Sequence, residues 1–213
     1  MKTGELVDFL ATGAEAVDPR QRARRYLASV TAGGLAAMLL TVGALGLHPK
    51  LLQEAFVPVF WVREAFCVAL GAAGLACVAR LSLPGVRLGL APAALAAPVI
   101  VIWMLAAASL IVAAPQQRAD LIFGQTASVC PLLIALVSVP LFIAMIWAMR
   151  GLAPTRLRLT GAAGGFAAGA LAALVYTLHC PELAAPFLGI WYVLGMLIPT
   201  AVGATFGPRL LRW

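Results

Sequence analysis

The sequence predicts an all-α, polytopic membrane protein with six transmembrane helices and both termini on the same side of the membrane. Hydrophobic residues make up 63% of the 213 residues and charged residues only 11%, whereas soluble domains are about half apolar and about a quarter charged. The few charges leave six long stretches without Asp, Glu, Lys, Arg or His. This composition excludes a lone soluble globule, a disordered region and a small disulfide-stapled secreted protein.

Six helices are expected, one from each apolar stretch, because a bilayer core requires about 20 apolar residues. The second stretch reaches this length only if Arg63, Glu64 and Arg80 lie at the membrane interfaces. The expected helices span residues 27–47, 60–81, 91–113, 129–149, 158–178 and 184–206.

Lysine and arginine are distributed unevenly between the two sides of this arrangement. The N-terminal tail, the second and fourth connections and the C-terminus together hold 12 of them, and the other side holds 3. The positive-inside rule therefore places both termini in the cytoplasm. The net charge of +7 is then mostly a signal of topology, and no direct contact with nucleic acid is expected.

The N-terminal tail, residues 1–26, is the only segment outside the predicted helices that is long enough to act as a module. Leu6, Phe9 and Leu10 fall on one stripe at helical spacing, and Glu5 and Asp8 lie mostly elsewhere around it. Residues 1–18 carry one lysine and four acids, whereas interfacial membrane anchors are normally basic. Two interpretations remain open: this helix docks into a groove on a basic partner protein, or it folds back on the protein's own loops.

The interiors of the predicted helices contain no ionisable residue of the kind that marks ion pathways, which disfavours ion-coupled transport. Small residues are common instead. Gly161, Gly165 and Gly169 form a four-residue repeat on the fifth helix that permits close approach of a neighbouring helix. Trp103 and Trp191 lie deep in their stretches, and we expect both to pack within the bundle.

Two cysteines, Cys130 and Cys180, are expected on the side opposite the arginines, in a compartment where disulfides can form. Each lies 25 residues from the turn near Thr155, so an antiparallel pair of helices would bring both to the same height. Packed helices are about 8–10 Å apart, whereas a disulfide requires Cα atoms within roughly 4.4–6.8 Å. The glycine repeat, or movement at the helix ends, would have to close this gap.

Each of these cysteines precedes a proline, which predicts that it lies where a helix begins or ends. With Pro131 in the first turn, Cys130 would lie at the positive end of the helix dipole, which favours the thiolate. His179 and Glu182 would complete, with Cys130 and Cys180, a site for a soft cation such as zinc or cadmium. Redox or metal sensing is the favoured interpretation, and a permanent structural disulfide or incidental thiols are the alternatives.

The other two cysteines, Cys67 and Cys77, lie ten residues apart on the second helix, about 15 Å along its axis. They cannot pair with each other. Both are expected to pack in the core, because a buried cysteine behaves as a small hydrophobic residue.

The chain resembles the NrsF family of bacterial inner-membrane anti-sigma factors along its whole length. The resemblance is carried by the opening Met1-Lys2-Thr3, the Cys-Pro at the head of the fourth helix, Leu178-His179-Cys180-Pro181-Glu182, and the closing Gly207-Pro208-Arg209-Leu210-Leu211. It implies that the protein is not an enzyme, and that its tail sequesters an extracytoplasmic-function sigma factor. The sigma factor would be freed when a heavy metal or an oxidant reaches the two cysteines in the periplasm.

The resemblance also implies a division into a cytoplasmic sigma-binding tail, residues 1–26, and a six-helix transmembrane sensor domain, residues 27–213. No resident cofactor is expected, and a cadmium- or zinc-type ion would act only as a transient signal. The rival interpretation is a membrane thiol-disulfide oxidoreductase. Such enzymes generally use a Cys-X-X-Cys pair, and no two cysteines here have that spacing.

Overall fold

The computed structural model describes residues 3–4, 19–83, 85–150, 152 and 154–212, and these residues form helices and connections without any strand. The all-α class is therefore confirmed for the described part of the chain. The proposed contact residues of the tail, Glu5, Leu6, Asp8, Phe9 and Leu10, lie outside the described residues. Their role stays a prediction.

Six helices are long and apolar enough to cross a membrane, as the sequence predicts. They are α2 (Pro19–Leu40, continued by the π-helical η1, Thr41–Leu45), α4 (Pro58–Leu81), α5 (Ala91–Val112), α7 (Cys130–Arg150), α8 (Leu157–Tyr176), and a sixth composed of α9 (Ala185–Phe187), η2 (Leu188–Tyr192) and α10 (Val193–Leu210). Two short helices, α3 (Leu51–Glu54) and α6 (Pro115–Phe123), lie in the connections and were not expected from hydropathy.

The first helix begins at Pro19 rather than near residue 27. Proline is well suited to the first helical position because it has no N–H to leave unbonded, and arginine is a good helix former. The arginines at residues 20–25 therefore belong to α2, and the boundary expected at residue 26 falls within a helix.

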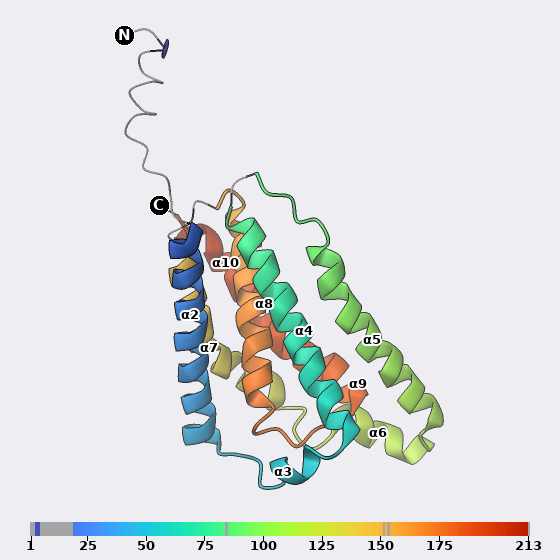
Figure 1. The fold of residues 1–213 in the computed structure, drawn as a ribbon. Coiled ribbons are helices and arrows are strands. Elements are labelled where there is room, and N and C mark those ends of the chain that lie inside the picture. The colour runs from blue at the N-terminus through green and yellow to red at the C-terminus, as the bar shows by residue number, and fades with distance from the viewer. Residues whose placement is uncertain (1–2, 5–18, 84, 151, 153, 213) are drawn as a thin grey trace.

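Helix α8 lies at the centre of the bundle, where it packs against α4, α7 and α10 (Figure 1). Helix α2 covers α7, and α5 stands at the edge against α4 and α9. The start of α2 and the end of α10 lie at one end of the bundle (Figure 1). We call this end the arginine end, because Arg25 donates to the Trp147 carbonyl there and Arg150 to the Leu210 carbonyl. The opposite end, with α3, α6, Cys130 and Cys180, is the cysteine end.

The glycine repeat of α8 faces α10 and not α7, so the expectation that it draws the two cysteine-bearing helices together is wrong. A Cβ atom on Gly169 would lie 2.9 Å from the Met196 Cα atom, and one on Gly165 would collide with the Pro199 carbonyl. Small residues here let the backbones of α8 and α10 touch. The two cysteines are brought together by the ends of their helices instead.

Replacing Gly165 with alanine is expected to destabilise the protein by about 1–3 kcal/mol, because overpacking forces a tight helix pair apart. The midpoint of thermal unfolding in detergent would measure the effect. Gly34→Ala is the matched control, since a Cβ atom there meets nothing within 4 Å. Equal midpoints for the two variants would contradict this interpretation of the α8–α10 contact.

The tryptophans differ in their packing. Trp191 is partly buried, and its indole N–H donates to the Ile122 carbonyl at 2.8 Å. Trp103 is 58% exposed on the outer face of α5, although its N–H reaches the Gly189 carbonyl at 3.2 Å. The prediction that both pack within the bundle is therefore wrong for Trp103, because α5 lies at the edge and has protein on only part of its surface.

Candidate functional site

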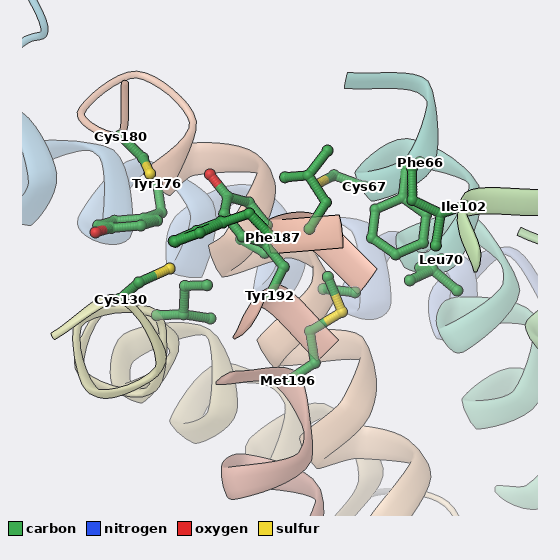
Figure 2. Close-up of a cluster of buried hydrophobic side chains, with 14 residues drawn as sticks. Phe66, Cys67, Leu70, Ile102, Cys130, Tyr176, Cys180, Phe187, Tyr192 and Met196 are labelled. Carbon is green, nitrogen blue, oxygen red and sulfur yellow. The ribbon is translucent and has the colours of Figure 1, made fainter. Parts of the chain in front are cut away.

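Cys130 and Cys180 lie in one buried cluster at the cysteine end of the bundle. Both are fully buried, and both are free thiols. Figure 2 shows them on the same side of the cluster, with the ring of Tyr176 beside them. The aromatic side chains of Phe187 and Tyr192 fill the neighbouring space, with ring centroids 6.4 Å apart.

Local sequence explains why each thiol lies at a helix end. Cys130 is the first residue of α7, and its N–H donates to the Thr126 carbonyl at 2.8 Å in the turn that leads into the helix. Cys180 follows the end of α8, and its N–H donates to the Tyr176 carbonyl at 3.1 Å. Because the residue before a proline avoids helical geometry, the next proline stops the chain from extending α8.

The hydrogen-bond donors converge on the sulfur of Cys180. The thiol of Cys130 makes the largest contribution in lowering the pKa of Cys180 to about 6, the backbone of Glu182 adds to it, and burial opposes both. The hydroxyls of Tyr192 and Thr126 also favour the thiolate; the Thr126 oxygen lies 3.9 Å from the sulfur. The sequence pointed to Cys130 as the thiolate through the helix dipole, whereas the structure favours Cys180, because Cys130 is itself a donor.

Cys180 is therefore expected to remain reactive at a pH where an ordinary thiol is not. Alkylation by iodoacetamide, followed by mass spectrometry, should be half-maximal near pH 6 and fall below it as the sulfur becomes protonated. Cys130→Ala removes the largest cause of the low pKa, so the half-maximal pH should rise by about one unit or more. If the wild type and Cys130→Ala both show the pH dependence of an ordinary thiol, the two sulfurs do not interact.

The structure does not bring His179 and Glu182 to the two thiols. The His179 ring nitrogen Nδ1 lies 3.0 Å from the Gly46 carbonyl, and the Glu182 carboxylate accepts from the Gln125 N–H at 2.7 Å. Within the described part of the chain, no group of three or more His, Cys, Asp and Glu residues is placed to hold a metal ion. A four-residue metal site stays a prediction, while both cysteines belong to one buried cluster.

Hydrogen bonds join the connecting segments at the cysteine end. The His48 N–H donates to the Leu178 carbonyl at 2.9 Å, and the His48 ring pairs with Glu54 at 3.0 Å. The same end of the bundle contains a polar cavity of about 460 Å³ lined by Asp120, Gly124, Gln125, Pro181 and Glu182. Two of the residues that line this cavity, Pro181 and Glu182, directly follow Cys180 in the chain.

Arg63 is the main residue whose role the sequence analysis missed. It was assigned only an expected position at the membrane interface, whereas the structure shows its side chain fully buried by protein. Its Nη1 donates to the Cys180 carbonyl at 2.8 Å and to the Glu182 carbonyl at 3.3 Å. One signal was available in the sequence: an arginine beside an acid at the border of an apolar stretch, since ionisable residues within membrane helices usually serve a function.

Two tyrosines and the two remaining cysteines are also buried in the bundle. Tyr176 and Tyr192, which the sequence did not single out, are buried around the thiols with ring centroids 6.1 Å apart. Cys67 and Cys77 are buried and unpaired, as core packing predicts.

Fold and site together define a polytopic α-helical membrane protein with a buried pair of free thiols at one end. The chain belongs to the NrsF family, described as "Negative regulator of sigma F", which matches residues 10–213.

Two relatives resemble it over the full length of both chains. It is 49% identical over 213 residues to the "Probable anti-sigma-F factor NrsF" of Azospira oryzae, and 36% identical over 215 residues to the "Anti-sigma-F factor NrsF" of Caulobacter vibrioides. These names describe regulators rather than enzymes. No solved structure matches the chain.

Proposed function

We propose that this protein is an inner-membrane anti-sigma factor that holds an extracytoplasmic-function sigma factor through its N-terminal tail. A heavy-metal ion or an oxidant acting on Cys130 and Cys180 releases the sigma factor. Family membership supports the anti-sigma activity. The observation that carries the sensing mechanism is the burial of two free thiols in one cluster.

The proposed orientation rests on the charges at the two ends of the bundle. The arginine end carries most of the basic residues, so the positive-inside rule assigns it to the cytoplasm and the cysteine end to the periplasm. Helix α2, which follows the first 18 residues, then begins on the side where a sigma factor is found. Residues 27–213 form the sensor in the membrane.

The tail suits a sigma factor on grounds of charge. Sigma factors contact DNA and therefore expose basic surfaces, and residues 1–18 carry one lysine against four acids. Leu6, Phe9 and Leu10 supply an apolar stripe that fits a groove, and Glu5 and Asp8 supply complementary charge. This arrangement makes the tail a competitor for the surface that the sigma factor otherwise presents to DNA.

Both proposed signals have balanced chemistry at the thiol pair. With a peroxide, the Cys180 thiolate and the Cys130 thiol give a disulfide, water and hydroxide; the sulfurs lose two electrons and the peroxide O–O bond breaks. With cadmium, both sulfurs bind the ion and the Cys130 proton leaves. Soft thiolates favour such ions, and neither reaction needs a further ligand.

Capture of the sigma factor by the full-length protein in detergent tests this proposal. The protein is used to pull down extracytoplasmic-function sigma factors from the same organism, with and without cadmium or peroxide. We expect one sigma factor to be captured and then released by either treatment. If none is captured, the proposal fails, and oxidation of a dithiol substrate becomes the assay for the oxidoreductase alternative.

A further inference from the structure

Arg63 connects the loop that carries Cys180 to helix α4. It lies in the second turn of α4, and its Nη1 donates to two carbonyls of that loop, those of Cys180 and Glu182, at 2.8 and 3.3 Å. A second link lies beside it, because the Thr177 hydroxyl donates to Glu64 Oε2 at 3.2 Å. The two consecutive charged residues of α4 therefore both hold the segment that follows α8.

The guanidinium of Arg63 is a buried positive charge with incomplete compensation. Its Nε donates to the partly exposed Glu64 at 3.3 Å, but Nη2 is buried and has no hydrogen-bond partner among the described residues. A buried charge is costly unless an opposite charge and hydrogen bonds satisfy it. The position of Arg63 therefore depends on Glu64 and on the two loop carbonyls that accept from it.

We propose that Arg63 transmits the chemical state of Cys180 to α4, because its guanidinium is hydrogen-bonded to the backbone carbonyl of Cys180 itself. This inference rests on the proposed function and assigns the residue through which the sensor acts. Arg63 is a positioning residue: it takes no part in disulfide formation or metal binding.

Both signals act on the same backbone. A disulfide and a metal ion bound by both sulfurs each tie Cys180 to Cys130 at the start of α7, so either one displaces the loop whose carbonyls accept from Arg63. Metal and oxidant, which differ in chemistry, thus act alike on Arg63. Displacement of these carbonyls weakens the hold of the guanidinium on the loop and frees the first turns of α4 to shift.

Helix α4 can carry such a shift across the membrane because it runs from the cysteine end to the arginine end (Figure 1). At the arginine end the Thr160 hydroxyl donates to the Leu81 carbonyl at 3.2 Å, and Arg80 donates to the Leu88 carbonyl at 2.7 Å. These bonds join the end of α4 to α8 and to the connection leading to α5. Movement of α4 therefore reaches the surface from which the tail emerges.

Arg63→Met tests the proposal by separating thiol chemistry from sigma release. In the wild type we expect peroxide to lower the retained sigma factor by about tenfold or more, and in Arg63→Met by less than about twofold. The yield of the Cys130–Cys180 disulfide, measured by mass spectrometry, should remain within about twofold of wild type. Arg63→Lys, which keeps the charge, should restore part of the release.

The matched control is Arg118→Met, which removes an exposed arginine from the same end of the bundle and should behave as wild type. If Arg63→Met forms the disulfide and releases the sigma factor normally, the proposal is overturned while the anti-sigma function stands. If its disulfide yield falls in parallel with release, Arg63 is only structural, and the proposal is again wrong. Failure of the wild type to capture a sigma factor would instead reject the proposed function.

Hydrogen exchange on the wild-type protein supplies a test that needs no variant to fold. Peroxide should accelerate exchange of the amides in the first turns of α4 by about tenfold or more, and Cys130→Ser/Cys180→Ser should show no change. Release of the sigma factor without any change in α4 exchange would overturn the assigned route.

Discussion

Cys130→Ser/Cys180→Ser is expected to insert and capture the sigma factor but to lose release by cadmium and by peroxide. Serine is close to cysteine in size, yet it forms no disulfide and is a poor ligand for soft cations. To turn a 99:1 bound population into a 1:99 one, a signal must favour the released state by about 5.5 kcal/mol. Covalent bond formation or binding of a metal by two thiolates supplies energy on this scale. The retained fraction in a pull-down measures the loss.

Cys67→Ser is the matched control, since Cys67 is fully buried in the same cluster. It should respond to both inducers like the wild type. Each single variant, Cys130→Ser and Cys180→Ser, should also lose disulfide formation, because the proposed disulfide requires both sulfurs. Induction that persists in the double variant would refute sensing by this pair. A serine hydroxyl buried without a partner is destabilising, so Cys130→Ala/Cys180→Ala provides a second version of the experiment.

Removal of residues 1–18 is expected to abolish sigma capture without preventing membrane insertion. The deletion stops just before α2, which begins at Pro19, so the arginines at residues 20–25 and all six long helices are kept. A finer change, replacement of Leu6, Phe9 and Leu10 by serine, should weaken binding by about 100-fold or more, since anchors at an interface each contribute on the order of 1–2 kcal/mol or more. Titration of sigma factor onto immobilised full-length protein measures the affinity.

Thr12→Ser serves as the control for the tail, because it alters a polar position away from the apolar stripe. Its affinity should equal that of the wild type. Capture that survives the deletion would move the binding surface to the loops of the arginine end. In that case the thiol pair and Arg63 would still be testable as a sensor, because their readouts do not depend on which segment holds the sigma factor.

The number of long helices and most of their ends were predictable, because the hydropathy of a transmembrane helix can be read directly along the sequence. The expected 91–113 and 129–149 differ little from the observed Ala91–Val112 and Cys130–Arg150. The position of each thiol at a helix end was also predictable, since proline restricts the preceding residue regardless of tertiary structure.

The rotation of each helix about its axis was not predictable in the same way. Whether Gly165 faces α7 or α10 depends on which neighbour packs on that side, and hydropathy is nearly equal around a helix composed of Ala, Gly and Leu. The burial of Arg63 was not predicted for a related reason: its partners are main-chain carbonyls far away in sequence. Every residue has a backbone carbonyl, so the sequence does not show which carbonyls accept from Arg63, and only the fold reveals them.

The complete burial of Cys130 and Cys180 bears on how the proposed disulfide is reduced as well as on how it forms. Reduction of a disulfide requires a thiolate to approach one of its sulfur atoms, and a bulky peptide thiol has no access to sulfurs enclosed by aromatic rings and loops. Small oxidants and single ions enter more easily than such reductants. Under the proposed function, we therefore expect the oxidised state to outlast the oxidant, so that recovery depends on synthesis of new chains rather than on reduction of oxidised ones.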